Sequence, residues 1–136
     1  MTSLTATRST TTTPTTAKEH IKVEGDMLLW KISYSKLTVE QAEALATQLR
    51  RHVDSGRVSK MLVDNKDLDG VFTKEVNQVW EDLMKYMMST GHLQKIACIS
   101  PSVVAKMQVD RLSRQAGTFH FNRAFLNEED AMAFLG

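Results

Sequence analysis

The 136-residue sequence has a single cysteine, almost no excess charge and no long hydrophobic run. One thiol, Cys98, cannot form an intramolecular disulfide, which predicts a reducing, cytoplasmic setting. No apolar run approaches the ~20 residues needed to span a bilayer. The formal net charge is +1, with acids and bases mixed along the chain, which argues against a nucleic-acid binder and its basic stripe.

Common enzyme signatures are also missing. The chain contains no G-x-G-x-x-G, G-K-[ST], H-E-x-x-H or G-x-S-x-G motif, and its histidines are scattered over different predicted elements. Cys98 lies in the apolar run KIACIS, with no neighbouring histidine or basic side chain to lower its pKa, so we predict a buried core thiol. These absences predict a protein that is not an enzyme and needs no cofactor.

The composition divides the chain into a tail and one domain. Nine of the first 18 residues are threonine, and Leu4 is the one large apolar side chain after Met1. Such a segment cannot bury enough apolar surface to offset its ordering entropy, so residues 1–18 are predicted to be a disordered tail. Without an apolar central region it does not fit a secretory signal. Residues 19–136 suffice for one domain with its own core.

Hydrophobic patterns predict five strands, of which the first two form a hairpin, and four helices. Two extended runs flank Gly25-Asp26, which predicts an N-terminal β-hairpin. Further apolar runs predict strands within 58–65, 93–100 and 118–125. Three- and four-residue spacing of apolar side chains predicts helices within 37–56, 73–91, 100–117 and 127–136.

Start signals support each predicted helix. Thr38 and Gln41 have capping-box spacing, and Asn127 precedes three acids that favour a helix N-terminus. Ser100 is the expected cap of the third helix, with Pro101 at its first position. Strands alternating with helices predict an α/β fold with a mixed sheet, a parallel centre, the N-terminal hairpin and four helices.

The segment 63–72 (VDNKDLDGVF) looks most like a site. It has the spacing that opens a calcium-binding EF-hand loop, at Asn65, Asp67, Asp69 and Gly70. That loop needs glutamate at position 12, but the residue there is Val76, and a predicted strand precedes the loop where a helix is required. We therefore predict no metal site.

A phosphoaspartate site at Asp64 also fails. It would need an acidic pair at the end of the first strand to hold magnesium and a lysine late in the chain. The first strands end in Tyr34-Ser35-Lys36, and no lysine follows Lys106.

Four segments together cover nearly the whole domain, namely VEGDMLLWKISYSKLTVEQAEAL, MLVDNKDLDGV, KIACISPSVVAKMQVDRL and FNRAFLNEEDAMAFL. They resemble the STAS-like (SpoIIAA-like) family of small bacterial domains related to anti-sigma factor antagonists. The resemblance implies a non-enzymatic α/β domain that docks to a protein partner or to itself. In antagonist members, phosphorylation of a serine in a D-S-S-G-type motif, at the start of the helix after the central strand, breaks partner binding.

The corresponding region here lacks the serine pair. Asp69-Gly70-Val71-Phe72-Thr73 stands in its place, with Thr73 as its one hydroxyl. Thr73 is expected to cap the next helix, and phosphorylation is the alternative. The expected partner-binding residues are Asn65, Asp67, Asp69 and Phe72. Phe72 is either an exposed anchor or a hydrophobic staple beside Thr73.

A second hypothesis is a small-ligand protein. Methionines recur along the predicted second helix and elsewhere, and their flexible side chains suit an adaptable cavity for a lipid or a nucleotide base. The residues concerned are Met61, Met84, Met87, Met88, Met107 and Met132. Ordinary core packing is the alternative for methionines at this spacing.

Overall fold

The computed structural model describes residues 19–136, so the predicted tail, 1–18, lies outside the described residues. The described elements follow the predicted order. They are β2 (Glu19–Glu24), β3 (Met27–Ile32), α1 (Val39–Asp54), β4 (Lys60–Asp64), α2 (Lys74–Thr90), β5 (Lys95–Ile99), α3 (Val103–Ala116), β6 (Asn122–Phe125) and α4 (Glu128–Leu135).

The strands form one five-stranded sheet in the order β2-β3-β4-β5-β6. β2 runs antiparallel to β3, and every other pair is parallel. The hairpin turns at Gly25-Asp26, where Gly25 has a φ of 62° and Asp26, like the other described non-glycine residues, has a negative φ, which fits a two-residue type II′ turn. The predicted mixed sheet with a parallel centre is confirmed.

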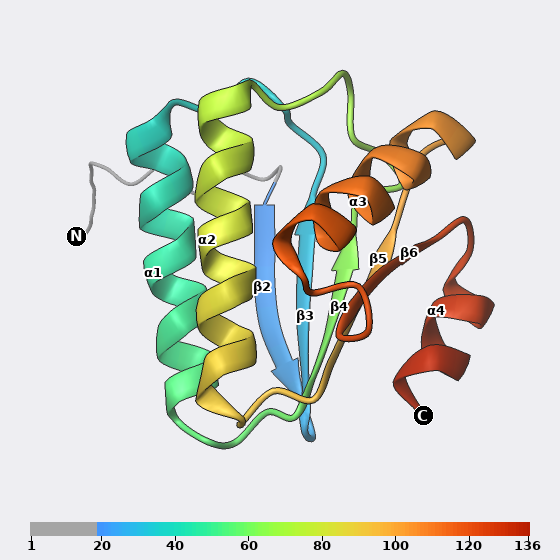
Figure 1. The fold of residues 1–136 in the computed structure, drawn as a ribbon. Coiled ribbons are helices and arrows are strands. Elements are labelled where there is room, and N and C mark those ends of the chain that lie inside the picture. The colour runs from blue at the N-terminus through green and yellow to red at the C-terminus, as the bar shows by residue number, and fades with distance from the viewer. Residues whose placement is uncertain (1–18) are drawn as a thin grey trace.

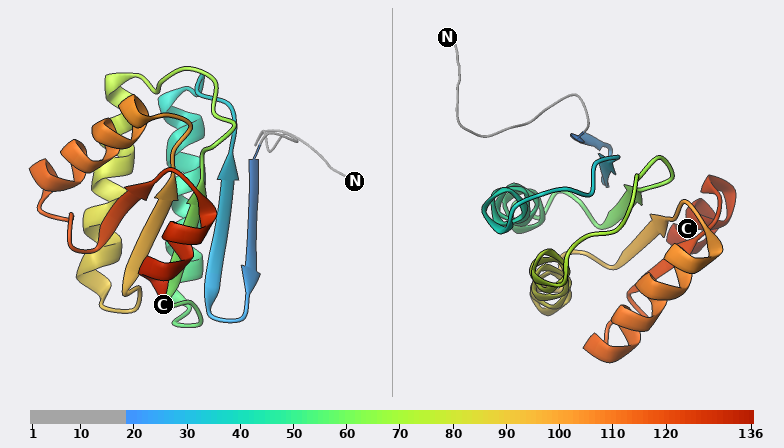
Figure 2. Two further views of the ribbon diagram at one scale, coloured as in Figure 1. Left: turned by 90° about the vertical axis from the view of Figure 1, so that its right-hand side faces the viewer. Right: turned by 90° about the horizontal axis from the view of Figure 1, so that it is seen from above.

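Helices cover the two faces of the sheet unequally. α1, α2 and α3 lie on one face, and α4 packs on the other (Figures 1 and 2). α1 and α2 lie side by side, whereas α3 lies at an angle to α2 (Figure 1). The carboxyl ends of the parallel strands meet at the upper edge of the sheet in this view, where the loops to the helices begin.

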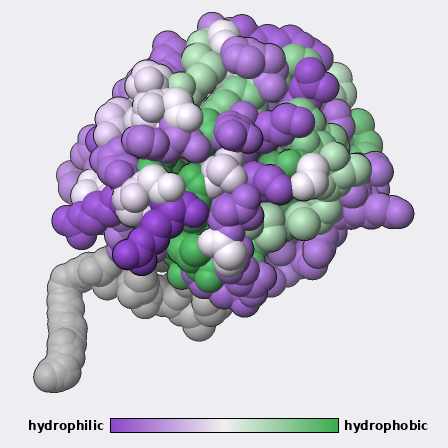
Figure 3. All heavy atoms as spheres, turned by 90° about the horizontal axis from the view of Figure 1, so that it is seen from below, coloured by the Kyte–Doolittle hydropathy of each residue, from purple (hydrophilic) through white to green (hydrophobic). Residues whose placement is uncertain are grey.

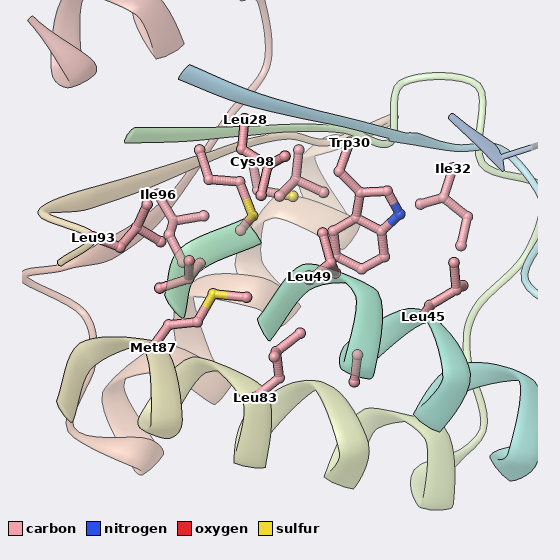
Figure 4. Close-up of a cluster of buried hydrophobic side chains, with 14 of the residues drawn as sticks. Leu28, Trp30, Ile32, Leu45, Leu49, Leu83, Met87, Leu93, Ile96 and Cys98 are labelled. Carbon is pink, nitrogen blue, oxygen red and sulfur yellow. The ribbon is translucent and has the colours of Figure 1, made fainter. Parts of the chain in front are cut away.

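The main core fills the space between the sheet and the first two helices. Leu49, Leu83 and Met87 point from α1 and α2 toward strand side chains such as Leu28 and Trp30 (Figure 4). Alternate side chains of β3, those of Leu28, Trp30 and Ile32, are all buried, so one face of this strand contacts the core.

The starts of three helices are as predicted. Thr38 and Gln41 form the complete capping box of α1, and Gly56 follows the helix with a φ of 74°. Thr73 caps α2, its side chain accepting a hydrogen bond from the backbone N–H of Val76. Asn127 caps α4 in the same manner.

The prediction for the start of α3 was wrong. The backbone N–H of Ser100 donates to the carbonyl of Phe125 in β6, so Ser100 extends the sheet instead of capping a helix. Ser102 is the cap, and its side chain accepts from the N–H of Ala105. α3 therefore begins after Pro101, at Val103.

The last strand is also shorter than predicted. Residues 118–121 form a turn, in which the N–H groups of Phe121 and Asn122 both donate to the carbonyl of Thr118. Thr118 is itself tied back to α3, because its N–H donates to the carbonyl of Ser113. β6 begins only at Asn122.

α4 is fixed at its carboxyl end by two lysines from the sheet. Lys60 Nζ donates to the Gly136 carbonyl at 2.7 Å, and Lys95 Nζ donates to the Phe134 carbonyl at 2.9 Å. This end of the molecule, seen from below, is mostly hydrophilic, with smaller hydrophobic areas between (Figure 3). Among the described helices, none is long and apolar enough to cross a membrane.

Candidate functional site

The loop that follows β4, residues 65–73, is pinned to the loop that follows β3. Ser35 Oγ donates to the Asp69 carbonyl, the Ser35 N–H donates to Asp69 Oδ1 at 3.4 Å, and the Asp69 N–H donates to the Ser33 carbonyl at 3.3 Å. Gly70 has a φ of 80°, and a Cβ atom there would lie 3.0 Å from Ser35 Oγ. These contacts fix the backbone of the loop at its middle.

Two of the four expected partner-binding residues face solvent. Asp67 and Asp69 are exposed, and Asp67 forms an ion pair with Lys31 at 3.3 Å. Asn65 and Phe72 are half-buried and turn inward. Asn65 Nδ2 donates to Cys98 Sγ at 3.3 Å.

Phe72 folds back onto the core. Its ring meets the ring of Trp80 edge to face, with centroids 5.6 Å apart, and Trp80 contacts Trp30 in the same way at 5.1 Å. Of the two sequence interpretations, this geometry matches the staple, although Phe72 packs on Trp80 and not on the helix position that a staple normally contacts.

Sequence reasoning missed the exposed apolar residue of this loop. Val71 is 68% exposed. The sequence pointed instead to its larger neighbour, Phe72, as a possible anchor, but the edge-to-face contact with Trp80 holds Phe72 inside. Gly70, the residue before Val71, has a positive φ. A glycine at this place in the sequence indicates a turn, and it was the one signal that the next side chain could be exposed.

A cavity lies directly beneath this loop, between α2, α3 and the sheet. Its volume is about 110 Å³, and its walls include Trp30, Phe72, Trp80, Met84 and Cys98. The indole N–H groups of Trp30 and Trp80 are buried and find no hydrogen-bond partner among the described residues. The wall is mainly apolar, and a third buried polar atom on a lining residue, Asn65 Oδ1, is also without a hydrogen-bond partner among the described residues.

The cavity is not lined by the predicted set of methionines. Of the six, only Met84 lies on its wall. Met61 and Met87 are fully buried in the main core, and Met107 and Met132 are exposed. Met87 of α2 is buried in the main core, and Met84 and Met88 are partly buried against it. The core interpretation of the pattern therefore holds for Met87, whereas Met84 also lies on the cavity wall.

Cys98 is buried, as the sequence predicted. Removal from water raises the pKa of its thiol to about 12, and the hydrogen bond from Asn65 opposes this shift only in part. At neutral pH the thiol is protonated, and a protonated buried thiol is a poor nucleophile. No cluster of three or more histidine, cysteine or acidic side chains within residues 19–136 is placed to hold a metal ion.

The sheet order, the three-helix layer and the loop at the start of α2 define a STAS-like α/β domain. The SpoIIAA-like family model matches residues 30–136, and this chain belongs to the SpoIIAA-like family. Comparison with curated proteins gives no significant match.

Solved structures share the fold at low sequence identity. An uncharacterised DUF3478-family protein with a SpoIIAA-like fold from Shewanella loihica is 20% identical, with a TM-score of 0.59 over 87% of this chain and 92% of that one. The unphosphorylated anti-sigma factor antagonist SpoIIAA is 11% identical, with a TM-score of 0.57 over 84% of this chain and 92% of that one. The phosphorylated Bacillus cell fate determinant SpoIIAA is 11% identical, with a TM-score of 0.58 over 85% and 96%.

Proposed function

We propose that this chain is a cytoplasmic, non-enzymatic regulatory domain that docks to a protein partner through residues 65–73 and the start of α2. Membership of the SpoIIAA-like family supports a regulatory domain. The observation that carries the docking surface is Val71, an apolar side chain 68% exposed in a loop whose backbone is held in place. A fixed loop loses little conformational entropy when a partner binds.

Charged side chains surround this apolar contact. Asp67 and Asp69 are exposed on the same loop. These two carboxylates would orient the partner and raise its association rate, and Val71 would lose its contact with water when the partner binds. Asn65 and Phe72 act indirectly, because they hold the loop on Cys98 and Trp80.

The proposed surface can be tested with two matched substitutions. Val71 and Val104 are 68% and 67% exposed, but Val104 lies on α3. We expect Val71→Asp to abolish capture of a partner from the native host, while Val104→Asp retains it and both variants fold normally. Equal capture by the two variants, or equal loss, would contradict the proposed surface.

Thr73 is the residue through which phosphorylation would act on this surface. Its side chain is exposed at the N-terminus of α2 and accepts the Val76 N–H at 3.2 Å. A phosphate there would add nearly two negative charges beside the docking loop. Among the structural neighbours, SpoIIAA is solved in an unphosphorylated and in a phosphorylated form, which supports a test of phosphorylation here.

Three substitutions separate the charge of Thr73 from its capping role. Aspartate and serine both cap helices well, whereas alanine does not. If phosphorylation controls docking, Thr73→Asp should reduce partner capture by tenfold or more, while Thr73→Ser leaves it unchanged. If Thr73 is only a cap, Thr73→Ala should lower the melting temperature, and Thr73→Asp should bind as the wild type does.

A second function, binding of a small apolar ligand, is favoured by the cavity between α2 and α3. Its 110 Å³ is below the ~150 Å³ of an engineered cavity that binds benzene, so in this conformation it has room for nothing larger than a short apolar chain. Native mass spectrometry of the protein purified from its host should show a retained ligand as added mass. A clean unliganded mass would count against this function.

A further inference from the structure

β2 forms an outer edge of the sheet. It pairs with β3 on one side, and it stands last in the strand order. Figure 2 shows β2 at the outer end of the sheet, with no helix or strand of the described residues beyond it. Within that part of the chain, one row of backbone donors and acceptors on β2 is therefore without a strand partner.

The hairpin register identifies which groups point outward. The turn closes on the pair Glu24 and Met27, and the residues that pair across a two-residue turn bond to each other with both backbone groups. Bonding alternates from there, so Lys22 also bonds inward to Leu29. The N–H and C=O groups of Ile21 and Val23 consequently point outward along the free edge.

The side chains of β2 alternate in charge on one face. Lys22 and Glu24 form an ion pair at 3.0 Å, with side chains 64% and 56% exposed. Val23 lies on the other face and is 41% exposed. The edge therefore offers an apolar side chain flanked by one positive and one negative charge.

We propose that a second copy of this chain pairs antiparallel with β2 about a two-fold axis at Val23, joining the two sheets into one. In this register Val23 meets its own copy through outward backbone groups, and Lys22 of each chain lies opposite Glu24 of the other. The same residues thus make two symmetrical opposite-charge pairs, as an isologous interface requires.

Other two-fold registers lose this complementarity. An axis at Lys22 also aligns outward backbone groups, but it places Lys22 opposite Lys22, and like charges directly opposite are destabilising. An axis at Ile21 places Lys22 opposite His20 and moves Glu24 beyond β2 of the second copy. Charges on an edge strand usually discourage pairing, but this pattern selects one register. The short edge buries less surface than a permanent interface, so the dimer is reversible.

Charge reversal tests the proposal by rescue. In a homodimer of Lys22→Glu chains, two glutamates face each other at both charge pairs, and in a homodimer of Glu24→Lys chains, two lysines do so. Each variant alone should dimerise at least tenfold more weakly than wild type in sedimentation equilibrium. An equal mixture should recover a heterodimer, because every facing pair then has opposite charges. Lys36→Glu, an exposed charge change outside β2, should not alter dimerisation.

Each outcome of the charge-reversal experiment either supports or contradicts the proposed dimer. A wild-type chain that stays monomeric up to millimolar concentration would overturn the proposal. Dimerisation that is equally strong in Lys22→Glu, or absent from the mixture of the two reversed chains, would do the same. Wild-type dimerisation that is lost in each single variant and restored on mixing would support it.

A cross-link tests the register itself. Residues 22 and 24 of opposite chains would form a non-hydrogen-bonded pair with Cα atoms about 4.5 Å apart, within the range of a disulfide. A mixture of Lys22→Cys and Glu24→Cys chains should therefore oxidise to a mixed dimer. Cross-linking of Lys22→Cys with itself would indicate the register centred on Lys22 and overturn the proposed one. The native thiol, Cys98, is buried and should not interfere.

Discussion

The three helices that cover one face of the sheet, α1, α2 and α3, are attached to it in two different ways. α1 buries five apolar side chains, namely Ala42, Leu45, Ala46, Leu49 and Val53, and α2 adds Val76, Leu83 and Met87. The buried side chains of α3 are Asp110 and Ser113. Its Val103, Val104 and Met107 are instead between 58% and 67% exposed.

Polar contacts take the place of apolar packing along α3. Asp110 Oδ1 accepts a hydrogen bond from the backbone N–H of Ala124 in β6 at 3.0 Å, and its other oxygen pairs with Lys106 at 2.9 Å. The cavity lies on this side of α2, whereas the space between α1 and α2 is filled. Within one layer, the first two helices are thus held by burial and the third by directed bonds around a gap.

The same truncation should therefore have unequal effects in the two regions. Leu49 of α1 is fully buried, whereas Leu112 of α3 is half-buried on the cavity wall. We expect Leu49→Ala to lower the free energy of unfolding by about 3 kcal/mol and Leu112→Ala by about 1 kcal/mol. Urea denaturation of both variants measures this difference. Equal losses would mean that α3 is packed as tightly as α1.

Removal of the Asp110 carboxylate should be the most damaging polar change in α3. Asp110→Ala leaves the buried N–H of Ala124 without its acceptor, which should lower the free energy of unfolding by about 2 kcal/mol. Asp110→Asn keeps an acceptor oxygen, so its loss should be smaller. Asp82→Ala, at an exposed carboxylate of α2, is the control and should change stability by less than about 0.5 kcal/mol. Similar losses for Asp110→Ala and Asp82→Ala would show that α3 does not depend on this bond.

Alkaline pH tests whether the region around the cavity excludes water. Burial raises the pKa of Cys98 from 9.0 to about 12. Between these pH values the unfolded chain has lost a proton that the folded chain keeps, so stability must fall as the pH rises. Relative to Cys98→Ala, the wild type should lose about 1.4 kcal/mol per pH unit above pH 9.

The comparison with Cys98→Ala cancels the titration of lysines and tyrosines, which both proteins share. The difference between their free energies of unfolding, measured in urea from pH 8 to pH 11, isolates the thiol. Parallel pH profiles would mean that water reaches Cys98 in the folded protein.

The sequence was sufficient for α1 because every signal in it agrees. The capping box at Thr38 and the three- and four-residue apolar spacing are local signals, and the structure shows both, the box complete and the spacing as five buried side chains. The start of α3 depended on a distant contact. The sequence favoured Ser100 as the cap, but Ser100 bonds to Phe125 in β6, and Ser102 caps the helix instead.

For the candidate site, the sequence located the strand-to-helix loop, and Asp67 and Asp69 face solvent there. That these residues bind a partner stays a prediction. The inward turn of Phe72 depends on Trp80, and the buried acid of α3 depends on a backbone N–H in β6. Neither contact could be predicted from the sequence, because each joins residues of different elements and hydrophobic periodicity describes one element at a time.

Adding a methyl group should have opposite effects in the two regions. Val109 of α3 lines the cavity, so Val109→Ile should raise the free energy of unfolding by up to about 0.8 kcal/mol. Val53 of α1 is fully buried in the filled region, so Val53→Ile should lower it by about 1 kcal/mol. Val104→Ile, on the exposed side of α3, should be neutral. If Val109→Ile is as destabilising as Val53→Ile, the cavity does not persist in solution, and the contrast between the two regions fails.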